Sequence, residues 1–171
     1  GGNYGSLGDG TTVAKSSPIQ VGALTTWLGL ALGYHYGVAV KTDATLWSWG
    51  RNNYGQLGQN NTTDYSSPVQ VGALTTWSDL ACGMKHTLGL KTDGTLWAWG
   101  GGGSGELGQG NTTNYSSPVQ VGALTTWLEM GAGMYASGAR TTDKKLYAWG
   151  WNSVGQLGDG TTTNRSSPVQ I

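Results

Sequence analysis

The residues whose side chains could carry out chemistry are few, and their spacing forms no catalytic or metal-binding set. His35 and His86 are the two histidines of the 171-residue chain, and they fall at different positions of a 50-residue repeat. No copy of the repeat therefore supplies a two-histidine metal site or a serine–histidine–acid triad. Cys82 is the single cysteine, so an intrachain disulfide is excluded, and we expect it to fill the core. We predict a non-enzymatic chain that binds no metal and no cofactor.

Two further patterns resemble ligand loops but are better explained as turns. The sequence Asp-Gly-Thr-Thr at 9–12 and 159–162 has the residue types of a calcium loop, but the second and third copies have Gln59 and Gln109 instead of the aspartate. A calcium site needs more carboxylates than this. The glycine run 100–103 lacks the lysine and the helix that follow a phosphate-binding loop. We therefore expect turn formation at all of these places.

Tryptophan recurs at a fixed phase of the repeat, which favours a packing role over a stacking site for sugars or bases. The recurring positions are Trp47, Trp49, Trp97, Trp99 and Trp149. Trp151 differs, because the other copies have Gly1, Arg51 and Gly101 in the same column. It cannot serve a packing role common to every copy, and we expect it to be exposed.

Charge and hydropathy exclude several classes of partner. Nine basic and nine acidic residues give a formal net charge of zero, without the basic block that follows a phosphate backbone. We therefore expect no nucleic-acid partner. No apolar run approaches the roughly 18 residues of a membrane span, and residues 1–10 have no signal-peptide pattern. The sequence leaves the cellular compartment undetermined.

An internal repeat dominates the chain and predicts an all-β fold. Residues 1–50, 51–100 and 101–150 align without an insertion, and 151–171 begin a further copy, which gives one repeat domain of about 3.4 copies. Within one copy, short strands are predicted at 77–81, 87–91 and 95–99, with Asp93-Gly94 as a two-residue hairpin turn. A fourth, outer strand is expected near Pro118, because proline is tolerated at a sheet edge. Four antiparallel strands in each copy correspond to one blade of a β-propeller.

The motifs of the repeat resemble those of the regulator of chromosome condensation repeat family. The resemblance rests on the segment 83–100, GMKHTLGLKTDGTLWAWG, and on 51–58, RNNYGQLG, and it covers essentially the whole chain. It implies a seven-bladed ring, of which this chain would be about half. Because three blades cannot close a circle, we expect either a longer polypeptide or self-association to complete the ring. The family's functions include nucleotide exchange on a small GTPase, chromatin binding and inhibition of β-lactamase, so the resemblance does not fix one function.

Two columns differ between copies while the framework columns do not. One is the turn between the first and second strands, and the other follows the third strand. In a four-stranded antiparallel meander these two connections leave the same end of the blade, so both columns should share one face of the propeller. The candidate partner-binding residues from these columns are Tyr34, His35, Tyr36, Arg51, Asn53, Tyr54, Met84, Lys85, His86, Met134, Tyr135 and Trp151.

The predicted function is a non-enzymatic binding module that presents these variable loops to a protein partner. Loops on a rigid scaffold commonly carry recognition, and the residue types are common in protein interfaces. Drift at unconstrained surface positions would explain the same variation. Two other functions remain open: a structural or attachment component of a microbial or viral surface assembly, and a carbohydrate-binding propeller that uses Trp151 and the tyrosines.

Overall fold

A computed structural model describes residues 2–23 and 25–171, and its strands form three sheets of four strands each. A short 3-10 helix, η1 (Asn3–Gly5), precedes them. Blade 1 contains β1 (Trp27–Gly33), β2 (Tyr36–Lys41), β3 (Leu46–Gly50) and β4 (Tyr65–Gln70). Blade 2 contains β5 (Trp77–Cys82), β6 (His86–Lys91), β7 (Leu96–Gly100) and β8 (Tyr115–Gln120). Blade 3 contains β9 (Trp127–Ala132), β10 (Ala136–Thr141), β11 (Leu146–Gly150) and β12 (Arg165–Gln170).

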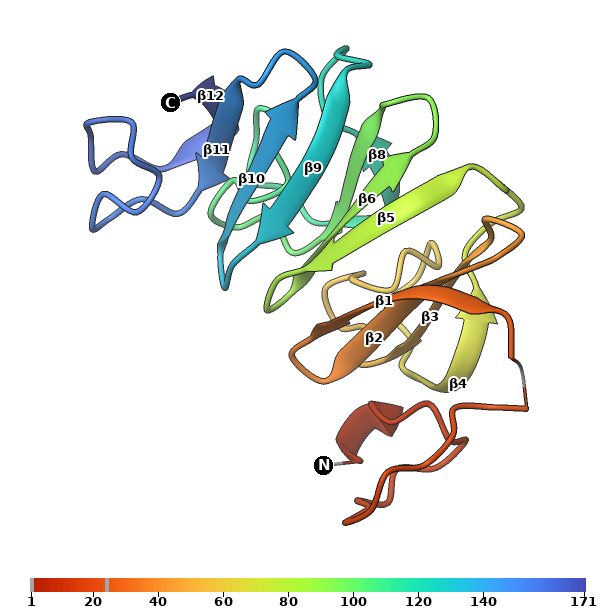
Figure 1. Ribbon diagram of the computed structural model, residues 1–171. Coiled ribbons are helices and arrows are strands. Elements are labelled where there is room, and N and C mark those ends of the chain that lie inside the picture. The colour runs from red at the N-terminus through yellow and green to blue at the C-terminus, as the bar shows by residue number, and fades with distance from the viewer. Residues whose placement is uncertain (1, 24) are drawn as a thin grey trace.

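Each sheet is an antiparallel meander, so the all-β prediction and the four-stranded blade are confirmed. The blades follow one another in sequence order, with β5 between β1 and β9 (Figure 1). The outer strand of each blade carries the predicted proline, for example Pro118 in β8. The third and fourth strands pair through an irregular register, as between Ala98 and Gly100 of β7.

The hairpin between the second and third strands differs from the predicted two-residue turn. Lys91 N donates to Thr95 O, and Gly94 N donates to Lys91 O, each over 3.0 Å. The loop is therefore three residues long, and within it only Gly94 has a positive φ, of 75°. Asp93 serves a different purpose from the one expected, because its carboxylate accepts hydrogen bonds from the backbone and hydroxyl of Thr95. This is the type I turn followed by a left-handed residue that is common in three-residue hairpins.

The core lies between the blades, where the repeated tryptophans pack. Trp99 and Trp149 are fully buried, and each indole Nε1 donates to a backbone oxygen of the preceding loop, Gln56 O for Trp99 and Glu106 O for Trp149. Leu80 of β5 packs against blade 1, in the cluster that contains Val40 and Leu46. Cys82 is partly buried beside the same blade. The predicted packing role of the recurring tryptophans is thus confirmed for Trp99 and Trp149.

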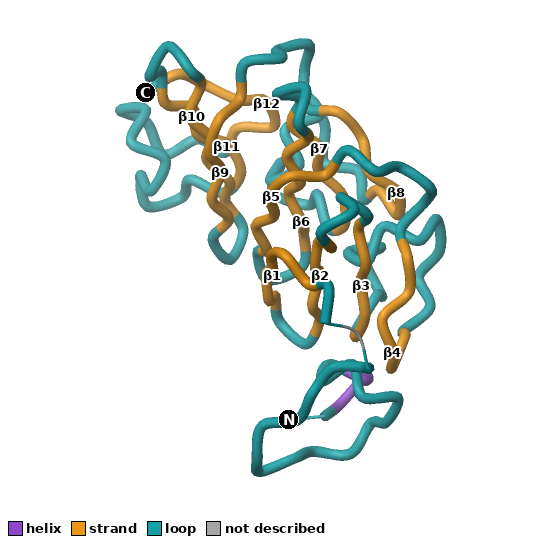
Figure 2. Tube along the Cα trace, turned by 45° about the vertical axis from the view of Figure 1, so that its right-hand side comes forward, coloured by secondary structure: helices purple, strands orange, loops and turns teal. Residues whose placement is uncertain are grey.

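The N-terminal segment has the sequence of an outer strand without its conformation. Residues 15–20 read KSSPIQ and occupy the same repeat position as β4, which reads YSSPVQ. They form no strand and are exposed. Figure 2 shows this segment as loop beside the 3-10 helix, below the first sheet. Within the described residues no third strand precedes it, whereas β4 pairs with β3.

The two outward faces of the three-blade stack have different chemistry. On blade 1, Leu30 and Leu32 are 61% and 63% exposed, although Leu80 at the same repeat position packs against a neighbouring blade. On blade 3, Arg140 takes the repeat position of Val40 and forms an ion pair of 2.7 Å with Glu129. The first face is apolar and uncovered, whereas the last combines this ion pair with Leu146 and Ile171, which are 47% and 45% exposed at the repeat positions of Leu46 and Val71. Within the described part of the chain, no helix is long and apolar enough to cross a membrane.

Candidate functional site

The two variable columns of the repeat meet at one end of every blade. In each blade the backbone nitrogen after the third strand donates to a carbonyl of the first turn: Arg51 to His35, Gly101 to Lys85 and Trp151 to Tyr135, over 2.7–2.8 Å. The expectation that both columns share one face is therefore confirmed. We call the residues of these loops, 34–35, 51–54, 84–85, 134–135 and 151–154, the variable-loop surface.

A row of aromatic and cationic side chains crosses this surface from blade to blade. Lys85 Nζ donates to Tyr54 Oη over 3.1 Å and lies 4.4 Å from the centroid of the Tyr54 ring. The same ammonium is 5.6 Å from the ring of Tyr135, which packs edge-on against Trp151 at 6.2 Å. These four residues come from the loops of three blades, so the row is a product of the packed stack.

A second group of side chains covers the blade 1 end of the surface. His35 packs against Tyr34 at 4.1 Å and against Tyr4 at 5.6 Å between ring centroids. The guanidinium of Arg51 lies 4.8 Å from the centroid of the Tyr4 ring. A cavity of about 220 Å³ lies between the two groups, and its lining includes Tyr34, Arg51 and Lys85.

The two cations of the surface have aromatic neighbours and form no ion pair with a described carboxylate, although the Glu106 carboxylate acts on Lys85 electrostatically. Within the described residues, the ion pairs involve Lys15, Arg140, Lys145 and Arg165 and leave out both Arg51 and Lys85. The hydrogen bond between Lys85 and Tyr54 raises the pKa of the ammonium and lowers the pKa of the phenol. The raised pKa keeps Lys85 positively charged at neutral pH, so the surface offers positive charge beside tyrosine rings.

Two of the predicted site residues do not belong to this surface, because the structure buries them between blades. Tyr36 is 1% exposed, and its hydroxyl donates to the backbone oxygen of His86. His86 is fully buried, and its Nε2 lies 3.0 Å from Ser137 Oγ in the next blade. Each is the first residue of a second strand, so its side chain enters the blade interface and cannot reach a partner. The remaining predicted residues all lie in the loops of the surface or at its edge.

Exposure varies among those remaining residues. Tyr34, Met134 and Trp151 are 52%, 62% and 39% exposed, and Asn53 is also exposed. His35, Arg51, Tyr54, Met84, Lys85 and Tyr135 are half-buried. The expected exposure of Trp151 is therefore confirmed.

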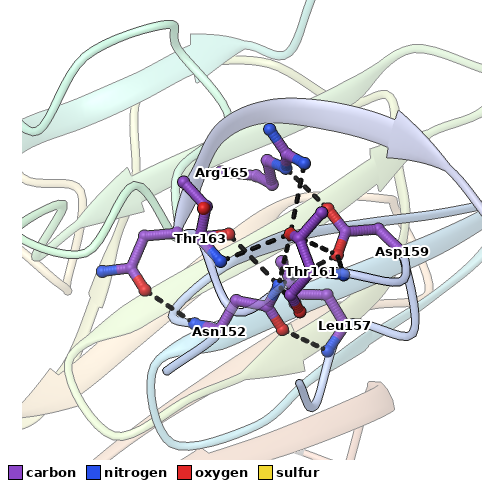
Figure 3. Close-up of polar contacts among 7 residues, drawn as sticks. Asn152, Leu157, Asp159, Thr161, Thr163 and Arg165 are labelled. Carbon is purple, nitrogen blue, oxygen red and sulfur yellow. Dashed lines mark hydrogen bonds and ion pairs between the residues drawn. The ribbon is translucent and has the colours of Figure 1, made fainter. Parts of the chain in front are cut away.

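Buried polar side chains hold the long loops that carry the surface. Asn152 is fully buried, accepts from Leu157 N over 2.9 Å and donates to Asp159 Oδ1 and to Thr161 O over 3.0 Å (Figure 3). Arg165 donates to Asp159 over 2.6 Å. Hydrogen bonds from Thr161 and Arg165 lower the pKa of Asp159. The Asp-Gly-Thr-Thr sequence thus forms an internally bonded turn, as predicted, and supports Trp151.

Two residues in or beside the surface were not among the predicted site residues. Tyr4 and Val154 occupy the repeat position of Tyr54, and Val154 is 76% exposed. The comparison of columns that selected Tyr54 and Trp151 included Val154 without selecting it, and the same column contains Tyr4 in the first copy.

Comparisons with known proteins agree with the repeat pattern. A model described as the regulator of chromosome condensation (RCC1) repeat matches residues 43–90, 93–139 and 143–171, and a second RCC1-repeat model matches 29–56 and 77–106. No curated protein matches the chain significantly.

Solved structures show the same fold. Human WBSCR16 superposes with a TM-score of 0.89 at 25% identity, over 99% of this chain and 46% of that one. Yeast RCC1 (Prp20) in complex with Kap60 gives a TM-score of 0.78 at 22% identity, over 87% of this chain and 37% of that one. Prp20p of Saccharomyces cerevisiae, described with its binding to Gsp1p and histones, gives 0.79 at 22% identity, over 87% and 39%. The chain thus spans less than half the length of each of these structures.

Proposed function

Because the chain belongs to the regulator of chromosome condensation repeat family, we propose that it is a non-enzymatic propeller module that binds a protein partner through the variable-loop surface. The observation that carries the proposal is the row Tyr54–Lys85–Tyr135–Trp151, which joins the loops of three blades into one continuous patch. The fold supports a protein-interaction module, and relatives described with Kap60, Gsp1p and histones engage proteins.

The composition of the surface favours one kind of partner. Tyrosine, tryptophan, methionine and arginine are enriched in protein interfaces, and Tyr34, Arg51, Met134 and Trp151 supply all four types. Arg51 and Lys85 form no ion pair within the described residues, and the nearby Glu106 acts on Lys85 only electrostatically, so carboxylates of a partner could form ion pairs with both cations. We therefore propose that the bound segment presents acidic side chains next to an apolar one.

Further blades would cover the apolar face of blade 1. Leu80 occupies the same repeat position as Leu30 and is covered, because it packs against the cluster of Tyr36, Val38 and Leu57 in the blade before it. Blade 3 of a second copy would bring Leu146 and Ile171 to that face, but it would also bury the ion pair of Arg140 and Glu129, which costs free energy against an apolar surface. We propose that a longer polypeptide, rather than a second copy of this chain, supplies the remaining blades.

Site-specific photocrosslinking tests where a partner binds. A benzophenone amino acid at Ser153, an exposed position of the variable-loop surface, is compared with the same group at Lys144, an exposed position of the opposite hairpin. We expect one or more proteins to crosslink through position 153 and not through position 144. A crosslinked protein is then purified, and its dissociation constant is measured with Trp151→Ala, Lys85→Ala and the matched control Lys144→Ala.

Truncation of Trp151 or Lys85 should weaken binding by roughly tenfold or more, because central aromatic and charged residues contribute most to protein interfaces. Lys144→Ala should leave the dissociation constant unchanged. Equal crosslinking at the two ends, or equal effects of the three substitutions, would contradict the proposal.

A further inference from the structure

We propose that a cavity between blades 1 and 2, away from the variable-loop surface, binds a small organic carboxylate through Lys91. The cavity has a volume of about 370 Å³, within the range typical of small-molecule sites. Blade 1 contributes loop residues that include Gln59, Asn60 and Leu74, and blade 2 contributes Trp77, Lys91 and Trp97. Lys91 ends the strand that begins at His86, so the cavity lies toward the opposite end of the blade from the variable loops.

Lys91 is the residue that selects for a negative charge. It is 7% exposed, and its Nζ lies 3.5 Å from the centroid of the Trp97 ring and 4.9 Å from that of Trp77. Within the described residues it forms no ion pair. The two rings offset part of the hydration that the ammonium loses, but a ring supplies no hydrogen-bond acceptor in its plane. The carboxylate of Asp93 acts on the ammonium electrostatically but forms no ion pair with it, so a ligand carboxylate would supply an acceptor and a countercharge in direct contact.

The other walls of the cavity set the character of the ligand body. Val71, Leu74 and Pro118 provide apolar surface, and Trp97 is only half-buried. Asn60 accepts a hydrogen bond from Ser117 through Oδ1, and its Nδ2 forms no hydrogen bond with the described residues. An apolar ring that carries one carboxylate therefore matches the cavity better than a fully hydrated anion such as phosphate.

Comparison of the three copies indicates that the combination of Lys91, Trp97 and Gln59 around one cavity is specific to blade 2. In blade 1, Lys41 lies 3.4 Å from the centroid of the Trp47 ring, but an acidic residue, Asp9, takes the position of Gln59. In blade 3, Thr141 replaces the lysine and Tyr147 replaces Trp97. Blade 3 folds with threonine at this position, so the lysine is not required to build a blade.

The test is a titration of the ¹⁵N-tryptophan-labelled chain with sodium benzoate at low ionic strength, followed by NMR of the indole N–H groups. Trp97→Phe assigns the reporting resonance, and benzamide, which has the same ring without the charge, is the matched probe. We expect a saturable shift of the Trp97 signal with benzoate below about 20 mM, and a dissociation constant at least roughly tenfold weaker for benzamide. Sodium chloride at the same ionic strength should produce no saturable shift.

Two substitutions at Lys91 connect the shift to the lysine. Lys91→Thr copies the residue of blade 3, and Lys91→Met keeps an unbranched side chain against Trp97. Both should weaken benzoate binding by roughly tenfold or more. Thr141→Lys, which adds a lysine to blade 3, should leave the benzoate constant measured at Trp97 unchanged. The proposal is overturned if benzoate gives no saturable shift, if benzamide binds as well, or if both Lys91 variants bind benzoate like the unchanged chain.

Discussion

Lys85 Nζ donates a hydrogen bond of 3.1 Å to Tyr54 Oη, and this contact joins a turn of blade 2 to the long loop that leaves blade 1. The ammonium also lies over the Tyr54 ring, 4.4 Å from its centroid. Because both residues belong to columns that vary between copies, the contact is absent from the register-equivalent pair Tyr135 and Ser104. In the proposed binding function, this contact would orient the two loops before a partner arrives and so lower the entropy cost of binding.

The Lys85–Tyr54 pair should show a measurable coupling in a double-mutant cycle of Lys85→Met and Tyr54→Ala. We expect a coupling free energy of about 0.5–1 kcal/mol from urea unfolding, because the pair is half-buried and combines a hydrogen bond with a cation–π contact. The pair Lys145–Asp143, exposed at the opposite end, should couple by less than about 0.5 kcal/mol. Coupling of Lys85 and Tyr54 no larger than that control would argue against a preorganised row.

Acid should destabilise the chain through His86. Ser137 Oγ donates to Glu106 O over 2.7 Å, so it accepts from His86 Nε2, and the buried Nδ1 has no partner among the described residues. Burial lowers the pKa of His86 to about 4 from 6.5. Between these two pKa values His86 is protonated in the unfolded chain but not in the folded chain. The free energy of unfolding therefore decreases as pH falls from about 6.5 to about 4, by up to about 3 kcal/mol.

Urea unfolding of the unchanged chain and of His86→Gln between pH 7 and pH 5 measures this loss. The glutamine keeps a donor for Ser137 but cannot be protonated in this range, so its free energy of unfolding should depend less on pH. Parallel curves for the two proteins would show that the histidine is not responsible.

The hairpin between the second and third strands should become more stable with glycine at its third position. Gly94 has a φ of 75°, and the same position holds Ala44 at 60° and Lys144 at 69°. A left-handed conformation costs a non-glycine residue roughly 1 kcal/mol. Ala44→Gly should raise the free energy of unfolding by about 0.5–1 kcal/mol.

Gly94→Ala is the reverse control for that hairpin. Besides the unfavourable φ, its added Cβ would lie 2.2 Å from Thr125 O, so we expect a loss of more than about 1 kcal/mol. Thermal unfolding of both variants measures the two changes. A loss of stability in Ala44→Gly would mean that the alanine side chain contributes packing that outweighs the strain.

A substitution on the uncovered face of blade 1 should change self-association but hardly change the free energy of unfolding. Leu30→Ser should change the free energy of unfolding by less than about 0.5 kcal/mol, because the side chain is 61% exposed. Leu80→Ser, at the same repeat position, should cost about 2 kcal/mol or more, because Leu80 packs against blade 1.

Light scattering of the 171-residue chain measures the effect of Leu30→Ser on self-association. If the apolar face drives self-association, the serine variant should have a lower average mass than the unchanged chain at the same concentration. A stable dimer that survives this substitution would show that association uses another surface.

The sequence by itself determined the blade. Its fixed 50-residue period, the hairpin residues and the recurring tryptophans predicted four antiparallel strands in each copy, and the order of the connections predicted that the variable columns meet at one end. The strands depend on local turn geometry and on the alternation of side chains, which can be recognised within one copy, and the period and the variable columns follow from aligning the copies.

Only the tertiary structure decided whether residues at the same repeat position have the same conformation and burial in each copy. Residues 15–20 have no third strand beside them in the described part of the chain and form a loop, whereas Tyr65–Gln70 pairs with β3 and forms a strand. Leu30 is exposed and Leu80 is packed for the related reason that a blade face is buried only where another blade covers it. Tyr36 and His86 stand beside the variable turns in the sequence, but the strand places their side chains in the interface between blades. The burial of a residue depends on whether a neighbouring blade covers it, and this cannot be determined from the sequence of its own repeat.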